Sequence, residues 1–254
     1  MTDFWVSYPV CYSMNFFQFI ISAVIALPKA WRYRSETFKQ MYLIGNQSVV
    51  LILVAVIMVN IVLTIEIGNK LEIFGAKSML GIIVGVSTIR EIGPIFAGLM
   101  VGGRVGAKIV SEIGNMKLTE QIDALRAFGV DPMKRLIAPR LTAAIIIMIP
   151  LVFLADIVGI IAGWFASVTI LNVDPSMFWV SLREGILFRD LSVGLVKPPF
   201  FGLIIRLVSC YFGYTVYGGA DNLGRAATRS VMYALLGVLL MDLVVTLIVR
   251  QLIT

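Results

Sequence analysis

The 254-residue sequence contains no histidine, and only 14% of its residues are charged. Without histidine, His-based catalysis and His-containing zinc sites are excluded. Charged residues make up about 25% of an average soluble domain, so this chain lacks the polar surface that a water-soluble protein needs. The only cysteines, Cys11 and Cys210, lie far apart in apolar segments, as small buried hydrophobic residues do. We expect no disulfide framework, no metal site and no cofactor bound by this chain itself.

Apolar residues are abundant instead, at 59% of the sequence. A helix needs about 20 predominantly apolar residues to cross the hydrocarbon core of a bilayer. Several runs reach or exceed that length, which predicts an all-α integral membrane protein. The predicted transmembrane helices cover residues 43–65, 79–103, 141–170, 195–217 and 230–250.

The N-terminal apolar run FFQFIISAVIAL (16–27) is too short to span a bilayer and ends at Pro28. Because it lacks a basic n-region and a cleavage site, it does not resemble a signal peptide. We expect residues 4–30 to form an interfacial helix. The chain then divides into an N-terminal interfacial or elbow segment, 1–37, and a membrane domain, 38–254.

Lysine and arginine gather before the first predicted helix, in the loop 104–140 and in the loop 218–229. By the positive-inside rule these segments face the cytoplasm, with the N-terminus inside and the C-terminus outside. Topology therefore explains the net charge of +6 without a nucleic-acid partner. An odd number of spans without an internal repeat fits a half-transporter that pairs with another subunit.

The segment GGRVGAK (102–108) has some likeness to a phosphate-binding loop. A P-loop requires GxxxxGK followed by Ser or Thr, whereas Ile109 follows Lys108 here. We therefore expect no nucleotide site in this chain.

The segment LTEQIDALRAFGVDP (118–132) has apolar residues at helical spacing. Gly129 and the Asp131-Pro132 step would end such a helix. A connector lying on the bilayer and a docking helix for a cytoplasmic partner are both compatible with this pattern. Anionic lipid would repel the acidic residues, which favours docking. The apolar positions are Leu118, Ile122 and Leu125, and the other faces carry Glu120, Gln121, Asp123 and Arg126.

The segment STIREIGPIFAGLMVGGRVG (87–106) places Arg90 beside Glu91 inside a predicted span. An ionisable group at the bilayer centre costs about 2.5–3.5 kcal/mol on insertion scales, so it should be paired or face a cavity. Pro94 has no N–H, so the carbonyl of Arg90 loses its helical donor, and Gly93 eases the steric conflict before proline. Such a break is tolerated only where protein or a water-filled cavity satisfies it. We therefore predict a helix break beside a cavity.

Three more ionisable residues, Asp156, Arg206 and Asp242, lie in the third, fourth and fifth predicted spans. A structural ion pair or hydrogen bond explains both aspartates at least as well as a direct role does, and Arg206 is their expected partner. The glycine pair at 98–102 forms a GxxxG pattern, which we interpret as helix packing.

The segment REIGPIFAGLMVGGRVGAKIVSEIGNMKLTEQIDALRAFGVDPMKRLIAPR (90–140) closely resembles the signature region of the MlaE (YrbE-type) permeases. The segment GGADNLGRAATRSV (218–231), with Asp242 and Thr246 after it, is similar to the ending of the same family. The resemblance spans roughly residues 38–250. The segment SCYFGYTVYGG (209–219) departs mildly from the commonest pattern, which leaves the lipid species open.

The resemblance implies the membrane subunit of an ATP-binding cassette (ABC) lipid transporter. Two copies would bind two cytoplasmic ATPase subunits, which hold ATP and Mg²⁺, and an Mce-domain assembly on the opposite face. The family's coupling segment maps onto Glu120, Gln121, Asp123 and Leu125. Its lipid cavity at the dimer centre maps onto Arg90, Glu91, Gly93 and Pro94.

The sequence therefore predicts a permease subunit for a phospholipid or another acyl-chain lipid in a bacterial inner membrane. One alternative is an ion-coupled secondary transporter in which Glu91, Asp156 or Asp242 carries protons. The other alternative is a structural anchor for an envelope complex. An organelle envelope of bacterial descent is also compatible with the sequence, although no transit peptide is evident.

Overall fold

The computed structural model describes residues 15–253, so residues 4–14 of the predicted interfacial segment lie outside the described part. Within 15–253 the chain is helical and contains no strand. A 3₁₀ segment, Leu27–Tyr33, joins the first two helices, and the π-helical turns Thr88–Ile92 and Met133–Ile137 precede the fourth and sixth. The helices are α1 Phe16–Ala26, α2 Arg34–Ile73, α3 Leu80–Ser87, α4 Gly93–Leu118, α5 Gln121–Ala127, α6 Ala138–Thr169, α7 Pro175–Gly185, α8 Phe188–Tyr214 and α9 Ala220–Ile253.

Five stretches of the described chain are long and apolar enough to cross a membrane, which confirms the all-α multi-pass prediction. The predicted spans lie inside these stretches almost completely, but the helices are longer, because hydropathy marks the hydrocarbon core and not the helix ends. The stretches are Phe16–Ile73, Lys77–Leu118, Met133–Thr169, Phe188–Tyr214 and Ala220–Gln251.

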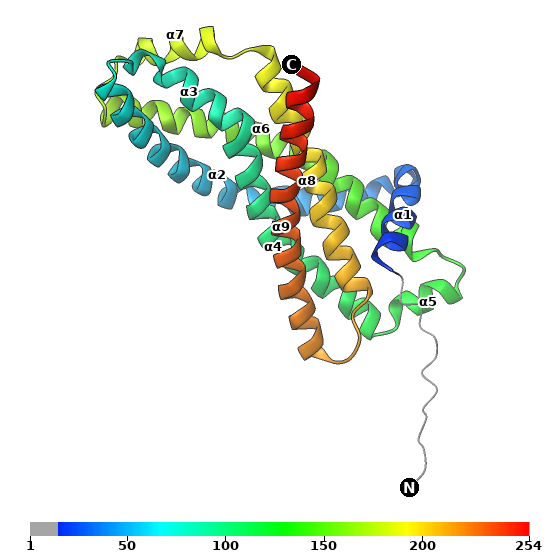
Figure 1. Ribbon diagram of the computed structural model, residues 1–254. Helices are drawn as coiled ribbons and strands as arrows, with labels where there is room; N and C mark the ends of the chain where they lie inside the picture. The colour runs from blue at the N-terminus through cyan, green and yellow to red at the C-terminus, as the bar shows by residue number, and fades with distance from the viewer. Residues whose placement is uncertain (1–14, 254) are drawn as a thin grey trace.

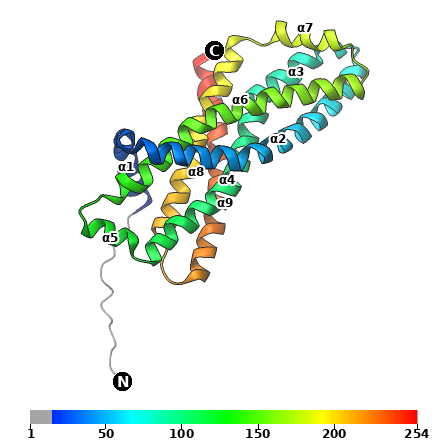
Figure 2. The same cartoon turned by 180° about the vertical axis from the view of Figure 1, so that it is seen from behind.

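The membrane helices form two groups that pack against each other through α6 and α8 (Figures 1 and 2). In the first group α8 and α9 run side by side, joined by a short loop, and α4 packs against both. In the second group α2 runs along α6. Helix α7 packs on α3 at the end of this group that lies away from α5. The turn Thr88–Ile92 lies where α3 passes into α4, between these two groups.

Helix α2 buries polar residues and turns apolar residues outward, the reverse of a soluble helix. Its buried face recurs every four residues and includes Ser48, Asn60 and Thr64, whereas Val54 and Met58 are exposed. Small residues on α6 permit this close contact: a Cβ atom at Gly159 would lie 2.7 Å from the side chain of Val56. Packing through small and polar residues is the usual way in which helices associate in lipid.

Helix α7 lies between two of the predicted spans, in residues 171–194, and was not predicted. Its sequence nevertheless carries a start signal, since Asp174 precedes a proline at the first helical position. The Asp174 carboxylate accepts a hydrogen bond of 2.8 Å from the Ser176 amide. Phe178 and Leu182 on α7 are buried against α3, where Gly81 leaves room for the α7 backbone.

Helix α1 confirms that the N-terminal apolar run is helical. Its Phe19 is fully buried and packs edge-on against Tyr211 of α8, with ring centroids 5.5 Å apart. Helix α1 is therefore held by the bundle through an aromatic contact. Its position at a membrane interface stays a prediction.

Candidate functional site

The candidate site begins at the π-helical turn Thr88–Ile92, between α3 and α4. The Gly93 amide donates to the carbonyl oxygen of Thr88, one residue farther back than in an α-helix. Because Pro94 has no N–H, the carbonyl of Arg90 lacks the donor that an α-helix would supply. The predicted break is thus a widened turn that keeps the chain helical. Single π-helical turns are frequent at functional sites.

Lys197 of α8 satisfies the carbonyl that Pro94 leaves free. Its ammonium nitrogen donates a hydrogen bond of 2.8 Å to the carbonyl oxygen of Arg90. The same nitrogen lies 2.7 Å from Oε2 of Glu91 and 2.8 Å from Oδ1 of Asp242. The Lys197 side chain is fully buried, and its ammonium meets two acceptors from the turn Thr88–Ile92 and the carboxylate of Asp242 on α9. We call Lys197, Glu91 and Asp242 the Lys197 cluster.

The sequence around Lys197 explains how α8 approaches the turn so closely. Gly194 lies one turn before Lys197, and a side chain there would collide with the carbonyl oxygen of Ile89. Pro198 and Pro199 follow directly and lie inside the helix. Lys197 was missed by the sequence interpretation, although a lysine before two prolines in an apolar span was a readable signal.

Arg90 binds a different carboxylate from the one beside it in sequence. Its Nε donates a hydrogen bond of 2.6 Å to Oδ1 of Asp190, and its Nη2 contacts the same oxygen. The other Asp190 oxygen accepts from the Leu187 amide at 2.9 Å and thereby caps the first turn of α8. Arg90 and Glu91 therefore do not pair with each other. Adjacent residues on a helix point in different directions, and each of the two pairs with α8.

The expected pairing of Arg206 with the two aspartates is also wrong. Asp242 binds Lys197, and Oδ1 of Asp156 is buried without a hydrogen-bond partner against Gly93. Arg206 is buried too, with Nε and Nη1 unpartnered. Arg206 follows Lys197 by nine positions on α8, about 13 Å along the helix axis. This rise separates it from the layer that contains Asp242.

The GxxxG pair packs α4 against α9, as expected. A Cβ atom at Gly98 would lie 2.9 Å from the side chain of Val238, and one at Gly102 would lie 3.3 Å from Leu235. These close approaches hold α9 beside α4. The same packing keeps Asp242 of α9 within reach of Lys197.

The Lys197 cluster is closed on the α8 side and open on the other. The Lys197 side chain is 0% exposed, whereas Glu91 is 40% exposed and Arg90 is 37% exposed. Lys197 lies nine residues after the start of α8 and 17 before its end, about 13 Å and 25 Å along the axis. The cluster is therefore in the half of the span that the charge distribution predicts to be extracytoplasmic.

The chemistry of this arrangement is ionic recognition. A partly exposed guanidinium and a partly exposed carboxylate can meet a charged ligand group, while buried partners on α8 hold both in place. Within residues 15–253, no group of three or more Cys, Asp or Glu side chains is placed to hold a metal ion. The described site contains no arrangement that we would assign to a cofactor.

Helix α5 lies at the other end of the bundle, where the coupling segment was predicted (Figure 1). Gly129 has φ +72° and ends the helix, since its amide and that of Val130 donate to the carbonyls of Arg126 and Leu125. Ile122 is fully buried, so α5 is fixed on the bundle. The helix is present as expected, and its coupling role stays a prediction.

The predicted coupling residues divide between two faces of α5. Asp123 lies 2.8 Å from the ammonium of Lys117 at the end of α4, and this hydrogen bond lowers the pKa of its carboxyl. Leu125 is partly buried, whereas Glu120 and Gln121 are exposed. Only the last two are fully available to a partner.

Arg126 connects α5 to the helix that carries Lys197. Its Nη2 donates to the hydroxyl of Tyr214, the last residue of α8, and its guanidinium lies 5.7 Å from the centre of that ring. This contact was not predicted. It gives α5 a direct link to α8.

Comparisons with known proteins agree with this architecture. A model of the family described as Permease MlaE matches residues 37–248. The chain is 37% identical over 231 residues to a probable ABC transporter permease protein of Rickettsia typhi, covering 91% of this chain and 88% of the relative. It is 33% identical over 228 residues to the intermembrane phospholipid transport system permease protein MlaE of Haemophilus influenzae, covering 89% and 87%.

A third relative is a probable ABC transporter permease protein of Synechocystis, 32% identical over 205 residues, with 81% of this chain and 78% of the relative covered. The family match, residues 37–248, includes all or most of each of the five membrane-crossing stretches. The chain is therefore a multi-pass membrane protein that belongs to the MlaE permease family.

Proposed function

We propose that this chain is the membrane subunit of an ATP-driven phospholipid transporter in a bacterial inner membrane. Two copies would enclose a lipid cavity, cytoplasmic ABC ATPase subunits would supply energy, and an Mce-domain protein would exchange lipid on the opposite face. The phospholipid assignment rests on the name of the Haemophilus relative. The observation that carries the proposal is the Lys197 cluster, an ionic group inside a membrane span that opens through Glu91 and Arg90.

The cluster gives the cavity wall a charged point among apolar residues. Arg90 would meet the lipid phosphate while Asp190 holds its guanidinium in place. Glu91 would exchange partners as the headgroup moves, since its carboxylate is half exposed and its bond to Lys197 is charge-assisted. Because one copy leaves this side of the cluster open, a second copy would complete the enclosure.

Energy would enter through α5. Its exposed residues Glu120 and Gln121 would contact the ATPase, together with Phe128, whose ring is 83% exposed. Movement of α5 would pass to α8 through Arg126 and Tyr214. Helix α8 would then shift Lys197 against the turn Thr88–Ile92.

Transport of a fluorescent phospholipid from liposomes that contain the ATPase complex tests this function. Arg90→Gln and Glu91→Gln should each abolish ATP-dependent transport while the complex still assembles. Lys77→Gln is the matched control, because Lys77 forms an ion pair at 2.7 Å with Glu72 at a partly exposed position far from the cluster. Transport at the wild-type rate by both the Arg90 variant and the Glu91 variant would refute the cavity assignment.

The docking role of α5 needs a separate test. Glu120→Lys reverses an exposed charge that no described ion pair involves, and it should weaken co-purification of the ATPase. Asp123→Asn is the comparison, because Asp123 already pairs within the chain with Lys117. If the Glu120→Lys variant co-purifies with as much ATPase as the wild type does, α5 is a surface connector.

The second candidate function is an ion-coupled secondary transporter, and Asp156 favours it. Its Oδ1 is buried inside a membrane-crossing helix without a hydrogen-bond partner, and ionisable residues in such helices often belong to proton relays. This function predicts lipid transport by the chain alone under a proton gradient. Dependence on ATP and on the ATPase subunits would exclude it.

A further inference from the structure

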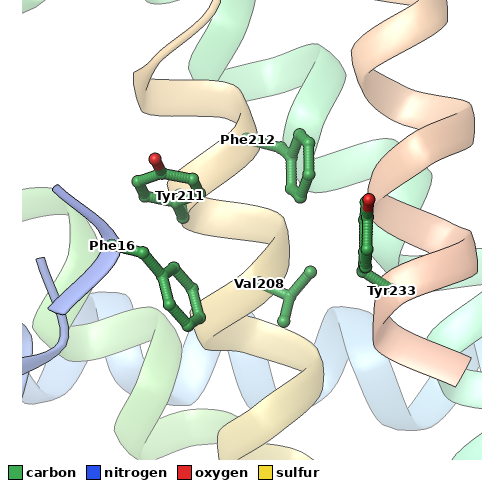
Figure 3. Close-up of a pocket in the computed structure, with 5 residues that line it drawn as sticks. All are labelled: Phe16, Val208, Tyr211, Phe212 and Tyr233. Carbon is green, nitrogen blue, oxygen red and sulfur yellow. The ribbon is translucent and has the colours of Figure 1, made fainter. Parts of the chain in front are cut away.

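An aromatic groove runs between α1, α8 and α9, away from the Lys197 cluster. It has a volume of about 400 Å³ and is lined by Phe16, Val208, Tyr211, Phe212 and Tyr233 (Figure 3). The rings of Phe212 and Tyr233 stack with their centroids 5.6 Å apart. Val208 follows Lys197 by eleven positions on α8, about 16 Å along its axis. The groove is therefore distinct from the cluster.

A second hollow shares Phe212 with this groove and is polar. It has a volume of about 290 Å³, and its lining includes Thr215, Asn222, Arg225 and Arg229. Both arginine side chains are exposed, and no ion pair involves either of them within residues 15–253. Two cations without carboxylate partners thus face the end of an apolar groove.

The two hollows lie one after the other along α9, the polar hollow nearer its N-terminal end. Arg225, Arg229 and Tyr233 are four residues apart, so they share one face of the helix. On α8, Thr215, Phe212 and Val208 follow in the same order from polar to apolar. In Figure 3 the C-terminal end of α8 is at the top, and the hydroxyl of Tyr233 is the upper end of its side chain. The site is cationic at the helix ends and apolar toward the middle of the span.

We propose that the two hollows form one site for an anionic glycerophospholipid of the cytoplasmic leaflet. Its phosphate would lie between Arg225 and Arg229, and an acyl chain would fill the aromatic groove. The proposal rests on the predicted cytoplasmic position of residues 218–229, most of which form the start of α9, and is independent of which lipid is transported. A phospholipid in that leaflet would place its charged headgroup at the helix ends and its acyl chains toward the middle of the span, which matches the order of the two hollows.

Charge complementarity selects this occupant over a second copy of the chain. Two copies related by an axis along the membrane normal would present the same face to each other. Both pairs of arginines would then approach each other, and Asp221, one turn before Arg225 on α9, would offset only half of their charge. An anionic headgroup supplies the missing negative charge.

The test measures retained lipid by native mass spectrometry of the full chain, extracted from bilayers of phosphatidylglycerol in phosphatidylcholine. Arg225→Gln/Arg229→Gln should weaken phosphatidylglycerol binding about 30-fold, since each basic residue near an anionic surface contributes roughly a factor of five. Val208→Trp, which fills the groove, should displace the lipid with the arginines intact. Arg32→Gln/Lys39→Gln removes two exposed cations outside the groove and should leave binding unchanged.

Wild-type retention of phosphatidylglycerol by the double arginine variant would overturn the proposal, as would equal retention of phosphatidylcholine. If Val208→Trp changes the oligomeric state but not the retained lipid, a second copy occupies the groove and the proposal is wrong. The variant Lys197→Gln tests whether lipid binding at this site is independent of transport. It should stop transport yet keep the phosphatidylglycerol, so the two proposals fail independently.

Discussion

Lys197 donates a hydrogen bond of 2.8 Å to the carbonyl oxygen of Arg90, the oxygen that Pro94 deprives of its helical donor. A residue on α8 thus completes the backbone of the turn before α4. The same ammonium also forms ion pairs with Glu91 and Asp242. The charge pair, the proline and the lysine therefore form one structural unit, so a change in any of them should disturb the others.

Replacing Lys197 by methionine tests this unit directly. Lys197→Met leaves two carboxylates facing each other and the Arg90 carbonyl without a donor. Removing one partner of a buried ion pair costs about 3–5 kcal/mol, so we expect a clearly lower thermal midpoint and no transport. The triple variant Lys197→Met/Glu91→Gln/Asp242→Asn removes the charges together and should recover stability without transport. Equal stability of the single variant and the wild type would contradict this account.

Pro94→Ala restores an N–H at the position where the turn lacks one. The Arg90 carbonyl would then have its own helical donor, and the turn would relax toward a regular α-helix. We expect reduced transport with little change in the thermal midpoint, because Pro94 lies in the first turn of α4 and the Arg90 carbonyl already has Lys197 as its donor. The measurement pairs thermal unfolding with the liposome assay. Pro150→Ala, at the proline inside α6, is the matched control and should not reduce transport.

Gly93 leaves room for the buried carboxyl of Asp156. A methyl group at Gly93 would collide with Oδ1 of Asp156, so Gly93→Ala should lower the stability by about 1–3 kcal/mol. The double variant Gly93→Ala/Asp156→Ala removes the collision and should recover most of that loss. Thermal unfolding of the purified variants measures both effects. If the second change brings no recovery, the collision does not explain the cost of the first.

The membrane helices and the turn before Pro94 were predictable, because they depend on local sequence. Apolar run length marks the spans, and Pro94 identifies the carbonyl that loses its donor. The pairing was not predictable in the same way. Which carboxylate meets Arg90 depends on the positions of Lys197 and Asp190 on α8, about 100 residues along the chain. Those positions depend on how α8 packs against the turn, and this packing cannot be read from a single sequence.

The ion pair between Asp123 and Lys117 should make the hold of α5 on α4 depend on pH. The pKa of Asp123 is lowered from 3.8 in the folded protein by its hydrogen bond to Lys117. A carboxyl with a lowered folded pKa stabilises the fold above its unfolded pKa, and this contribution is lost as the pH falls through the folded value. Hydrogen exchange of the α5 amides should therefore be constant from pH 7 to about pH 4 after correction for intrinsic exchange.

Below that pH, protonation of Asp123 releases Lys117, and protection of the α5 amides should fall. The effect should stay below about 1 kcal/mol, because the Asp123 side chain is 43% exposed and solvent screens the pair. Lys117→Met is the control: it removes the partner, so α5 should be less protected at pH 7 and show little further loss on acidification. A wild-type protein that loses α5 protection between pH 7 and pH 5 would contradict the lowered pKa and assign the change to another group.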